Sequence, residues 1–415
     1  MKSPLRLPKT KRRAGLITAP RSLEPYLNAI QDFFSNYRRK TSSSTFTLLY
    51  TQRFILIHME SRITIADIAQ HVGLSTATVS MALNSVHKSR IPEATIERVQ
   101  QAARHLGYVP NLTARNLRTG TTSTVGFVSS GVTVTRFASQ MIRGILDTAD
   151  EHSFSVLMME VDRSPDGMAR ALSGLRSRAV EGFAVGLMSP RLVSLPHLTS
   201  GLPGVIINGQ ADGWHSIMPD EEDAGRRAIA YLRAHGHRRV ALIGRYPTEP
   251  APEVSICIGA RLRGIDAGCA ASGVQIVDEA PGEAWESPLG FEGANAILDR
   301  LDRSGAAAIV AANDRIAMGV YQALCDRNLR VPDDMSVLSF DDEPLANMMR
   351  PPVTTLHLPY LEMGALGMEF LVDCARSHGR AQKNADNQSS QSEPHSEPTL
   401  VHVPIVERDS VRTIG

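Results

Sequence analysis

The sequence predicts two folds in one chain: a small all-α head that contains a helix-turn-helix, and a larger α/β portion built from two doubly wound parallel sheets. Residues 62–109 repeat apolar side chains at helical spacing, which is typical of a helical bundle. From Thr124 onward, short runs rich in β-branched residues alternate with helical segments, the pattern of parallel strands covered by helices. The 415 residues are enough for two or three domains.

The first 59 residues are strongly basic. They carry 11 Lys and Arg against 2 Asp and Glu, whereas residues 121–415 carry 26 against 37. A basic start on an acidic body predicts that the start meets a polyanion. Two other interpretations stay open: residues 1–59 are a disordered basic extension without a partner, or translation begins at Met59 and residues 1–58 are not made.

Residues 60–109 are predicted to form the head. Apolar residues recur at helical spacing from Ile65 to Val72, and Gly73 then interrupts the pattern. Ser75 is a good N-cap for a second helix. A third helix is expected from Pro92 to Leu106, since proline is tolerated in a first helical turn.

Residues 121–415 are predicted to form the α/β portion, and their number favours two similar subdomains. Residues 379–398 are polar and of low complexity, which predicts a flexible insertion. The candidate strands are Val125–Val128, Ser155–Met159, Gly182–Val185, Gly204–Ile207, Val240–Ile243, Ala307–Ala311, Ser336–Phe340 and Thr399–Pro404.

The second helix of the head is expected to present one face outward. Val79, Ala82 and Leu83 supply its apolar face, which leaves the opposite face to Thr76, Ala77, Ser80 and Met81. In a helix-turn-helix reader this face enters the DNA major groove. An ordinary helical hairpin in another all-α domain has the same periodicity, so the spacing alone leaves both interpretations open.

Five motifs in a fixed order favour the DNA reader: TIADIA, STATVSMALN, GYVPN, ARNLRTG and VGFV. Together they closely resemble the lactose-repressor (LacI/GalR) family of transcription regulators, over residues 62–415. The resemblance implies a sequence-specific DNA-binding regulator, by the family's default a repressor, controlled by a small ligand. It also implies a hinge helix at residues 110–120 and a two-lobed, periplasmic-binding-protein-like sensor at residues 121–415.

The resemblance implies roles for individual residues of the head and hinge. Leu117 matches the leucine that wedges into the minor groove and kinks the duplex; its alternative is a core leucine of a fourth helix. Many members carry Arg where this chain has Met81, so Met81 can pack on a base but cannot read guanine by a bidentate contact. Candidates for phosphate contacts are Lys88, Arg90 and Arg98. The positions implied to contact DNA are Thr64, Ser75, Thr76, Ala77, Thr78, Ser80, Met81, Asn84, Asn111, Ala114, Arg115, Leu117 and Arg118.

The resemblance also implies a ligand site in the sensor, made of Ser130, Arg261, Trp285, Asp314 and Asp342. Arginine and aspartate supply charge-assisted hydrogen bonds to hydroxyl groups, and an indole offers a flat face to a pyranose ring. These side chains suit a sugar, or a related polyol or nucleoside. The alternatives are structural: Asp314 caps the helix that follows it, and Trp285 packs in the core.

The resemblance further implies that the chain crosses between the lobes near residues 217, 341 and 357. Lobe 1 is then approximately 121–217 and 341–357, and lobe 2 approximately 218–340 and 358–415. It also implies a homodimer on a near-palindromic operator, with a tetramer as the alternative, in the bacterial cytoplasm at the nucleoid.

Several other classes of protein are disfavoured by the sequence. His235-Gly-His237 has no recognisable third ligand, and the acidic run from Asp220 to Asp223 fits a helix start, so we expect neither a metal nor another cofactor. The four cysteines lack CxxC spacing, no apolar run is long enough to span a membrane, and no nucleophile motif indicates an enzyme. The main alternative is a periplasmic-type solute-binding protein without a DNA-binding role, which the absence of a secretory signal disfavours.

Overall fold

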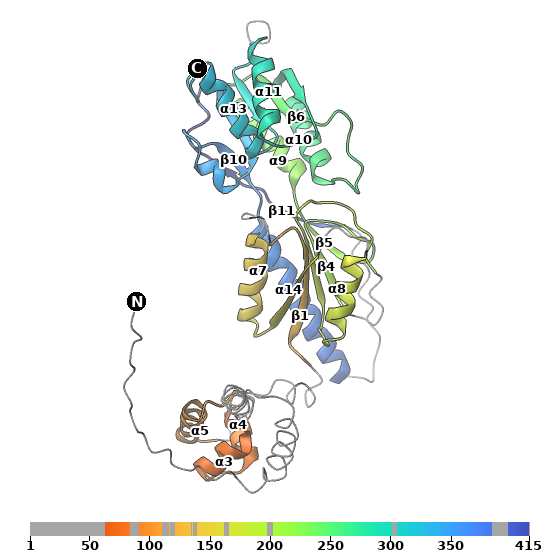
Figure 1. The fold of residues 1–415 in the computed structure, drawn as a ribbon, viewed down its shortest axis with the longest axis vertical. Coiled ribbons are helices and arrows are strands. Elements are labelled where there is room, and N and C mark those ends of the chain that lie inside the picture. The colour runs from red at the N-terminus through yellow and green to blue at the C-terminus, as the bar shows by residue number, and fades with distance from the viewer. Residues whose placement is uncertain are drawn as a thin grey trace, which may run out of the picture. The chain divides into compact units, whose positions relative to one another are not determined.

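The structure is a computed structural model. It describes residues 63–83, 91–109, 116, 121–133, 135, 139–161, 166–196, 202–300, 305–383 and 397–414. The chain divides into two compact units, Met1–Asn111 and Leu112–Gly415, each of which is described by itself (Figure 1).

The first unit contains the predicted helix-turn-helix. Its helices are α3 (Ile65–Val72), α4 (Thr76–Leu83) and α5 (Glu93–His105), which bury a shared core that includes Ile68, Val79 and Val99. Gly73, with φ of 66°, ends α3 in the left-handed conformation that glycine adopts without strain. The turn therefore brings α4 directly after α3, as the sequence predicts.

The second unit holds two six-stranded sheets of equivalent topology, one in each lobe. The lobe 1 sheet has the order β11-β5-β4-β3-β1-β2, and all its paired strands are parallel. Its strands are β1 (Thr124–Ser130), β2 (Ser155–Glu160), β3 (Phe183–Leu187), β4 (Gly204–Ile207), β5 (His215–Pro219) and β11 (Thr399–Val401). Helices α7 (Ser139–Glu151) and α14 (Tyr360–Lys383) pack on this sheet in one apolar core. Helix α8 (Gly167–Arg176) packs on the same sheet in a second apolar core.

The lobe 2 sheet has the order β12-β10-β9-β8-β6-β7 and is parallel except where β12 meets β10. Its strands are β6 (Arg239–Arg245), β7 (Gln275–Pro281), β8 (Ala308–Ala311), β9 (Ser336–Asp341), β10 (Thr354–His357) and β12 (Ile405–Val406). Helices α9 (Glu221–Ala234) and α10 (Cys257–Ser272) cover one face, while α11 (Ser287–Leu298), α13 (Asp314–Asp326) and the 3-10 turn η3 (Pro344–Asn347) cover the other.

The chain passes between the lobes three times: after β5, after β10 and after β11. Passages after Pro219 and His357 lie close to those predicted near 217 and 357. The passage predicted near 341 is wrong, because β9 pairs with both β8 and β10 inside lobe 2. The third passage instead joins β11 to β12.

The lobe assignments change accordingly. Residues 341–357 belong to lobe 2, whereas α14 and β11 belong to lobe 1, the reverse of the prediction. The physical reason is that α14 buries Met363, Met368 and Leu371 against the lobe 1 sheet. Of the predicted strand Thr399–Pro404, only Thr399–Val401 is a strand, β11; β12 begins just after this range and belongs to the other sheet.

Two smaller differences concern the element boundaries. The strands β5, β7, β10 and β12 were not among the candidates from the sequence. Helix α14 continues to Lys383 and so extends into the predicted insertion at residues 379–398; residues 384–396 lie outside the described part of the chain. Within the described residues, no helix has both the length and the apolar character needed to span a bilayer.

Candidate functional site

The face of α4 that was predicted to point outward is accessible in the head. Thr76, Ala77 and Met81 are exposed, with Met81 exposed to 37%, while Val79 and Ala82 are buried in the core of the unit. Ser80 is half-buried. The fold of the head therefore leaves the start of α4 free to meet another molecule.

Three further residues predicted to contact DNA also hold the helices in shape. The Thr64 hydroxyl accepts a hydrogen bond from the backbone N–H of Asp67, and the Asp67 carboxylate accepts one from the backbone N–H of Thr64. The two bonds together cap α3. The Ser75 hydroxyl accepts from the N–H of Thr78 at 3.1 Å and so caps α4. Ser75 is thus the N-cap that the sequence predicts.

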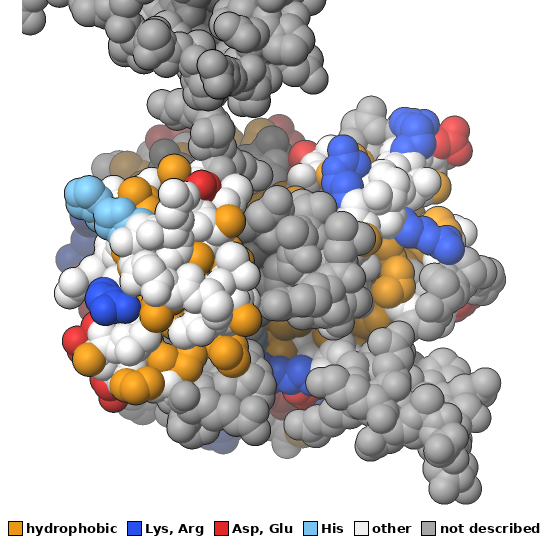
Figure 2. Space-filling model, turned by 90° about the horizontal axis from the view of Figure 1, so that it is seen from below, with side chains coloured by type: hydrophobic (Ala, Val, Ile, Leu, Met, Phe, Trp, Pro, Cys, Tyr) orange, Lys and Arg blue, Asp and Glu red, His pale blue; other side chains and the backbone are white. Residues whose placement is uncertain are grey.

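The described part of the head carries little positive charge. Its only basic side chains of the Lys and Arg type are Arg98 and Arg104, against Asp67, Glu93 and Glu97. In Figure 2, the described surface of this unit is accordingly mostly white and orange, with a pale blue histidine pair. Arg98 donates to the Val72 carbonyl at 3.2 Å and so also holds the end of α3.

The remaining predicted DNA contacts lie outside the described residues. They are Asn84, Asn111, Ala114, Arg115, Leu117 and Arg118, and with them the phosphate candidates Lys88 and Arg90.

The second unit contains a cavity of about 320 Å³ beside the interlobe passages. Lobe 1 contributes residues that follow its strands, among them Met188 after β3 and Asn208 after β4. Lobe 2 contributes residues such as Asn313 after β8 and Asp341 at the end of β9. The carboxyl ends of parallel strands are where doubly wound sheets bind ligands. The lining is completed by Ser189, Pro190, Glu221, Tyr246, Val254, Ser255, Cys257, Ile258, Arg261, Trp285, Glu286, Arg315, Glu343, Leu358 and Tyr360.

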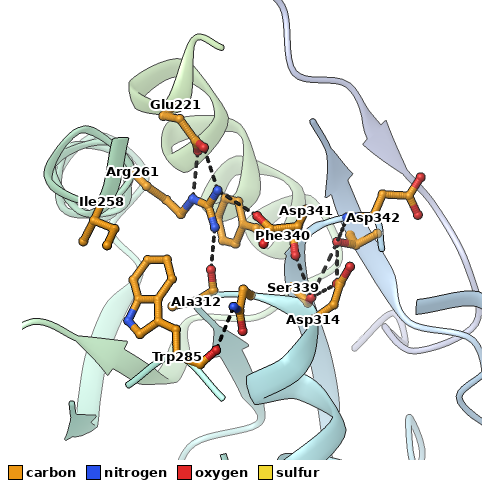
Figure 3. A network of polar contacts seen from close by, with 12 residues as sticks. Glu221, Ile258, Arg261, Trp285, Ala312, Asp314, Ser339, Phe340, Asp341 and Asp342 are labelled. Atoms are coloured by element: carbon orange, nitrogen blue, oxygen red, sulfur yellow. Dashed lines mark hydrogen bonds and ion pairs between the residues drawn. The ribbon is translucent and has the colours of Figure 1, made fainter. Parts of the chain in front are cut away.

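Arg261 lies at the centre of a buried network in the cavity wall (Figure 3). Its Nε and Nη2 donate to the two carboxylate oxygens of Glu221 at 2.8 and 2.6 Å, and Nη2 also donates to Asp341 at 2.9 Å. Its Nη1 donates to the carbonyl of Ala312 at 2.6 Å. The guanidinium group is therefore fixed by three segments that are distant in the sequence.

Charge and aromatic contacts both favour the charged form of Arg261. Burial opposes the charge, but Glu221 and Asp341 outweigh it, so the pKa of Arg261 is raised. The guanidinium carbon lies 4.7 Å from the centre of the Phe340 ring and 5.5 Å from that of Trp285. Burial raises the pKa of Glu221, and Arg261 opposes that rise.

Trp285 lines the cavity, and hydrogen bonds of its indole N–H and its backbone carbonyl fix its position. Its indole N–H donates to the Gly244 carbonyl at 2.8 Å, and its own carbonyl accepts from Asn313. Tyr246 meets the indole edge to face, at 5.8 Å between ring centres. The structure thus brings together two of the five predicted ligand residues, Arg261 and Trp285.

The other three predicted ligand residues do not line this cavity, so their contact with a ligand stays a prediction. Asp314 is fully buried and accepts from Ser339, Thr355 and the backbone N–H of Glu343. Burial raises the pKa of Asp314 well above its usual range. The alternative role of Asp314 as a helix cap is wrong, because the side chain that caps α13 is that of Asn313, at 2.9 Å from the Ile316 N–H.

Asp342 and Ser130 are engaged elsewhere. The Asp342 carboxylate accepts a hydrogen bond from Arg408 at 2.6 Å and pairs with His357 at 3.0 Å. It is therefore bound to residues at and near the end of β10, where the chain leaves lobe 2. Ser130 is buried at the end of β1, and its carbonyl accepts from the Met188 N–H. Asp342 is held by its two partners and Ser130 is enclosed in the core, so neither side chain lines the cavity.

Five charged residues of the cavity were not among the predicted ligand residues: Glu221, Glu286, Arg315, Asp341 and Glu343. The acidic run at Asp220 was interpreted only as a helix start; Asp220 does cap α9, but Glu221 turns to Arg261. Asp341 directly precedes Asp342 and has a φ of 99°, a conformation that the strand pattern does not indicate. One feature of the sequence could have indicated these residues. Glu221 lies at the start of a helix and Asp341 at the end of a strand, where side chains of a doubly wound sheet meet a ligand.

The histidine pair of the sequence belongs to the structure of lobe 2. His237 is buried, and its Nε2 lies 3.1 Å from the Arg412 carbonyl. Among the described residues, no group of three or more His, Cys, Asp or Glu side chains is arranged to hold a metal ion.

Comparison with known proteins identifies both units. Residues 64–111 match the family described as bacterial regulatory proteins, lacI family, and residues 229–411 match a periplasmic binding protein-like domain. The chain is 31% identical over 316 residues to the ribose operon repressor of Escherichia coli (strain K12), which covers 74% of this chain and 92% of that protein. It is 26% identical over 315 residues to catabolite control protein A of Priestia megaterium, covering 74% and 91%.

Solved structures agree on the fold. The lac repressor dimer bound to operator and the anti-inducer ONPF has a TM-score of 0.62 and 23% identity, and covers 85% of this chain and 100% of that one. The complex of the transcriptional regulator CelR with cellobiose has a TM-score of 0.51 and 24% identity, covering 84% and 100%. With a relative above 30% identity matched over nearly its whole length, and a helix-turn-helix that matches the family model, the chain belongs to the LacI family of bacterial regulatory proteins.

Proposed function

We propose that this chain is a sequence-specific DNA-binding transcription repressor that a small carbohydrate-like effector controls. The observation that carries the proposal is the joining, in one chain, of an accessible α4 face to a two-lobed sensor with a polar cavity at its strand ends. The family membership supports both halves of the proposal.

On the DNA side, α4 enters the major groove with Thr76, Ala77 and Met81 toward the base edges. The exposure of these three side chains supports this role. The hinge residues at 110–120 then fold on the operator, and Leu117 wedges between base pairs. The positive charge that attracts phosphates comes mainly from residues outside the described helices, including Lys88, Arg115 and Arg118.

On the effector side, a sugar, polyol or nucleoside binds in the cavity between the lobes. Arg261 and its carboxylate partners lie in the lobe 2 wall, and Met188 and Asn208 lie in the lobe 1 wall. A molecule that contacts both walls favours one angle between the lobes. Since the hinge segment leads into lobe 1, that angle controls how the hinge residues of two subunits are spaced.

The assembly that fits this mechanism is a homodimer on a near-palindromic operator, because a two-fold symmetric reader matches two half-sites. The solved lac repressor dimer bound to operator supports this assembly. We place the protein in the bacterial cytoplasm at the nucleoid, where operator DNA lies. A periplasmic-type solute-binding role is disfavoured, since the helix-turn-helix would have no purpose there.

The test is selection of bound sequences from a random DNA library by the full chain, followed by fluorescence anisotropy at two salt concentrations. We expect one enriched near-palindromic sequence, and log affinity that falls with log salt at about −0.9 per phosphate contacted. Ala77→Glu puts a carboxylate against the bases and should abolish binding, whereas the matched control Ala94→Glu, exposed on α5, should retain it. Binding without any sequence preference over competitor DNA would contradict the proposal.

Leu117 has a separate test. Leu117→Ala should weaken operator binding, since the kinked duplex loses its wedge, while circular dichroism and sensor binding stay unchanged. Leu400→Ala, at a sensor residue exposed to 55%, is the control. An operator affinity equal to that of the parent would assign Leu117 to a packing role instead.

A further inference from the structure

The charged residues around the cavity are unbalanced. Four carboxylates line it, from Glu221, Glu286, Asp341 and Glu343, and two guanidinium groups, from Arg261 and Arg315. The formal charges of these lining residues therefore sum to −2, which is 2 positive against 4 negative.

The first of the two arginines has little capacity left for an anionic ligand. Arg261 contacts both oxygens of Glu221, one of Asp341 and the Ala312 carbonyl, which uses four of the five N–H donors of a guanidinium. Its side chain is exposed to only 4%, and aromatic rings of Phe340 and Trp285 lie beside it. An anion could reach this charge only by displacing a buried carboxylate.

The second arginine, Arg315, is also paired with two carboxylates, although its side chain is exposed to 38%. Arg315, at the start of α13, donates through Nε to Glu343 at 2.9 Å and through Nη1 to Glu286 at 2.7 Å. These two carboxylates come from the segment after β9 and from the residue before α11. Each arginine of the lining thus lies between two carboxylates.

A cavity of this composition offers acceptors rather than free cations. Ionised carboxylates accept hydrogen bonds from hydroxyl groups, and such bonds are stronger than neutral ones. A phosphate or a further carboxylate would instead face like charges, whose repulsion grows as water is excluded. We infer that the cavity selects uncharged polyhydroxylated molecules and rejects their anionic derivatives, with the Glu286–Arg315–Glu343 chain as a determinant of that choice. The inference rests on the proposed effector site and narrows its ligand class.

The test measures direct binding to the full chain by calorimetry, with matched neutral and anionic probes. The neutral probes are ribose, glucose, fructose and cellobiose; the anionic ones are the phosphate monoesters of ribose, glucose and fructose, and glucuronic acid. We expect at least one neutral sugar to bind, and to bind at least about tenfold tighter than its own anionic derivative. Tighter binding of any anionic member than of its neutral parent overturns the inference, as does the failure of every neutral sugar to bind.

A charge-removal variant tests the determinant. Glu286→Gln with Glu343→Gln leaves Arg315 without a carboxylate partner and should reduce the preference for the neutral member about tenfold or more. Since Glu343 is exposed to only 11% and the double variant can lose stability, Glu286→Gln alone, at a position exposed to 58%, provides a milder second variant with a smaller shift in the same direction. Glu292→Gln, exposed on α11 and outside the cavity lining, is the control that should keep the parental preference.

The outcome is separable from that of the proposed function. Sugar binding is measured without DNA, so a protein that binds neutral sugars but no operator would refute the regulator and leave the charge selection standing. An unchanged preference in both carboxamide variants would refute the role of the Glu286–Arg315–Glu343 chain.

Discussion

At the scale of single residues, the sensor depends on charges that are buried together. Arg261 and Glu221 are exposed to 4% and 2%, and their two-point contact compensates each for the loss of water. The family resemblance implies a site role for Arg261, which lines the cavity, but its carboxylate partners lie 40 and 80 positions away along the chain. Such a pairing follows from tertiary packing, which the residue pattern around Arg261 does not contain.

Removal of the Arg261 side chain should strongly destabilise the fold. Arg261→Met leaves Glu221 and Asp341 buried without a cation, so we expect a loss of about 3–5 kcal/mol in the free energy of unfolding. The control Arg263→Met, at a position exposed to 54% on the same helix, should lose less than about 1 kcal/mol. Urea unfolding followed by circular dichroism compares them, and equal losses would show that the buried pairing adds no stability.

Asp342 should give stability a defined dependence on pH. Burial alone would raise its pKa, but contacts with His357 and Arg408 lower it below the ordinary value of 3.8. A carboxyl whose pKa is lower in the folded state stabilises the fold above its unfolded pKa, and this stabilisation is lost as the pH falls through the folded value. Asp342→Asn should therefore cost about 1–3 kcal/mol at neutral pH, with a difference from the parent that shrinks below about pH 4.

Urea unfolding across this pH range, with the exposed Asp326→Asn as the control, tests the prediction. A loss for Asp342→Asn that stays constant down to acid pH would mean that the carboxylate charge is not what stabilises this region.

At the scale of elements, close helix packing sets the position of the cavity wall. Helices α9 and α10 approach each other at Gly225 and Gly264: a Cβ on Gly264 would lie 2.0 Å from the Glu222 carbonyl oxygen, and one on Gly225 would lie 2.4 Å from that of Arg261. Glu221 begins α9 and Arg261 lies on α10, so this contact brings their side chains into register. The glycines therefore act on the site through backbone spacing.

Alanine at Gly264 should disrupt this spacing. Because backbone rather than a flexible side chain occupies the position of the added methyl group, the helices must separate, and we expect Gly264→Ala to destabilise by several kcal/mol, about 3 or more. Gly174→Ala in α8 is the matched control: its nearest neighbours would lie at 3.8 Å, so the helix-propensity gain of up to about 1 kcal/mol should appear unopposed. Thermal unfolding distinguishes the two, and a harmless Gly264→Ala would contradict the packing argument.

Helix α4 carries the specificity prediction at this scale. Met81→Arg adds a bidentate donor on the exposed face, and should shift the preferred base at one operator position toward guanine by about 1–3 kcal/mol. Gln101→Arg, exposed on α5, adds the same charge elsewhere and should strengthen binding without a change in preference. The selection from the random DNA library is repeated with both variants. An unaltered consensus sequence for Met81→Arg would show that residue 81 does not contact the bases.

The helices and strands also differ in how well their sequences predict them. The helices of the head could be predicted because they carry local signals: a glycine at 73, a cap at Ser75 and a proline at the start of the third helix. The buried strands of both sheets were recognisable from their apolar runs. In contrast, β12 has two residues and β5 begins with a histidine beside a tryptophan-containing turn, so neither shows the length or apolar run by which strands are recognised.

At the scale of the whole molecule, regulation is a coupling between two sites. The family and the fold assign DNA binding to one unit and effector binding to the other. The path of the chain between the lobes could be predicted only in part, because which lobe receives α14 depends on the sheet that its apolar face covers and not on its own periodicity. The same limit explains why Asp314 and Asp342 were expected in the cavity.

The coupling should be reciprocal. If a saturating effector changes operator affinity by some factor, saturating operator must change effector affinity by the same factor. Anisotropy titrations of labelled operator with and without effector, and calorimetric titrations of effector with and without operator, give the two factors independently. Unequal factors would show that the two titrations do not follow a single linked equilibrium, for example because the subunits dissociate.

The order of elements along the chain also has a consequence for synthesis on the ribosome. The lobe 1 sheet begins with β1 at residue 124 but receives its covering helix α14 only after residue 360 and its edge strand β11 only by residue 401. The part of the sheet face that α14 covers thus stays exposed on a nascent chain until α14 has been synthesised. A premature stop before β11 releases a complete head without a complete sensor, a product that proteases and chaperones would meet as unfinished protein.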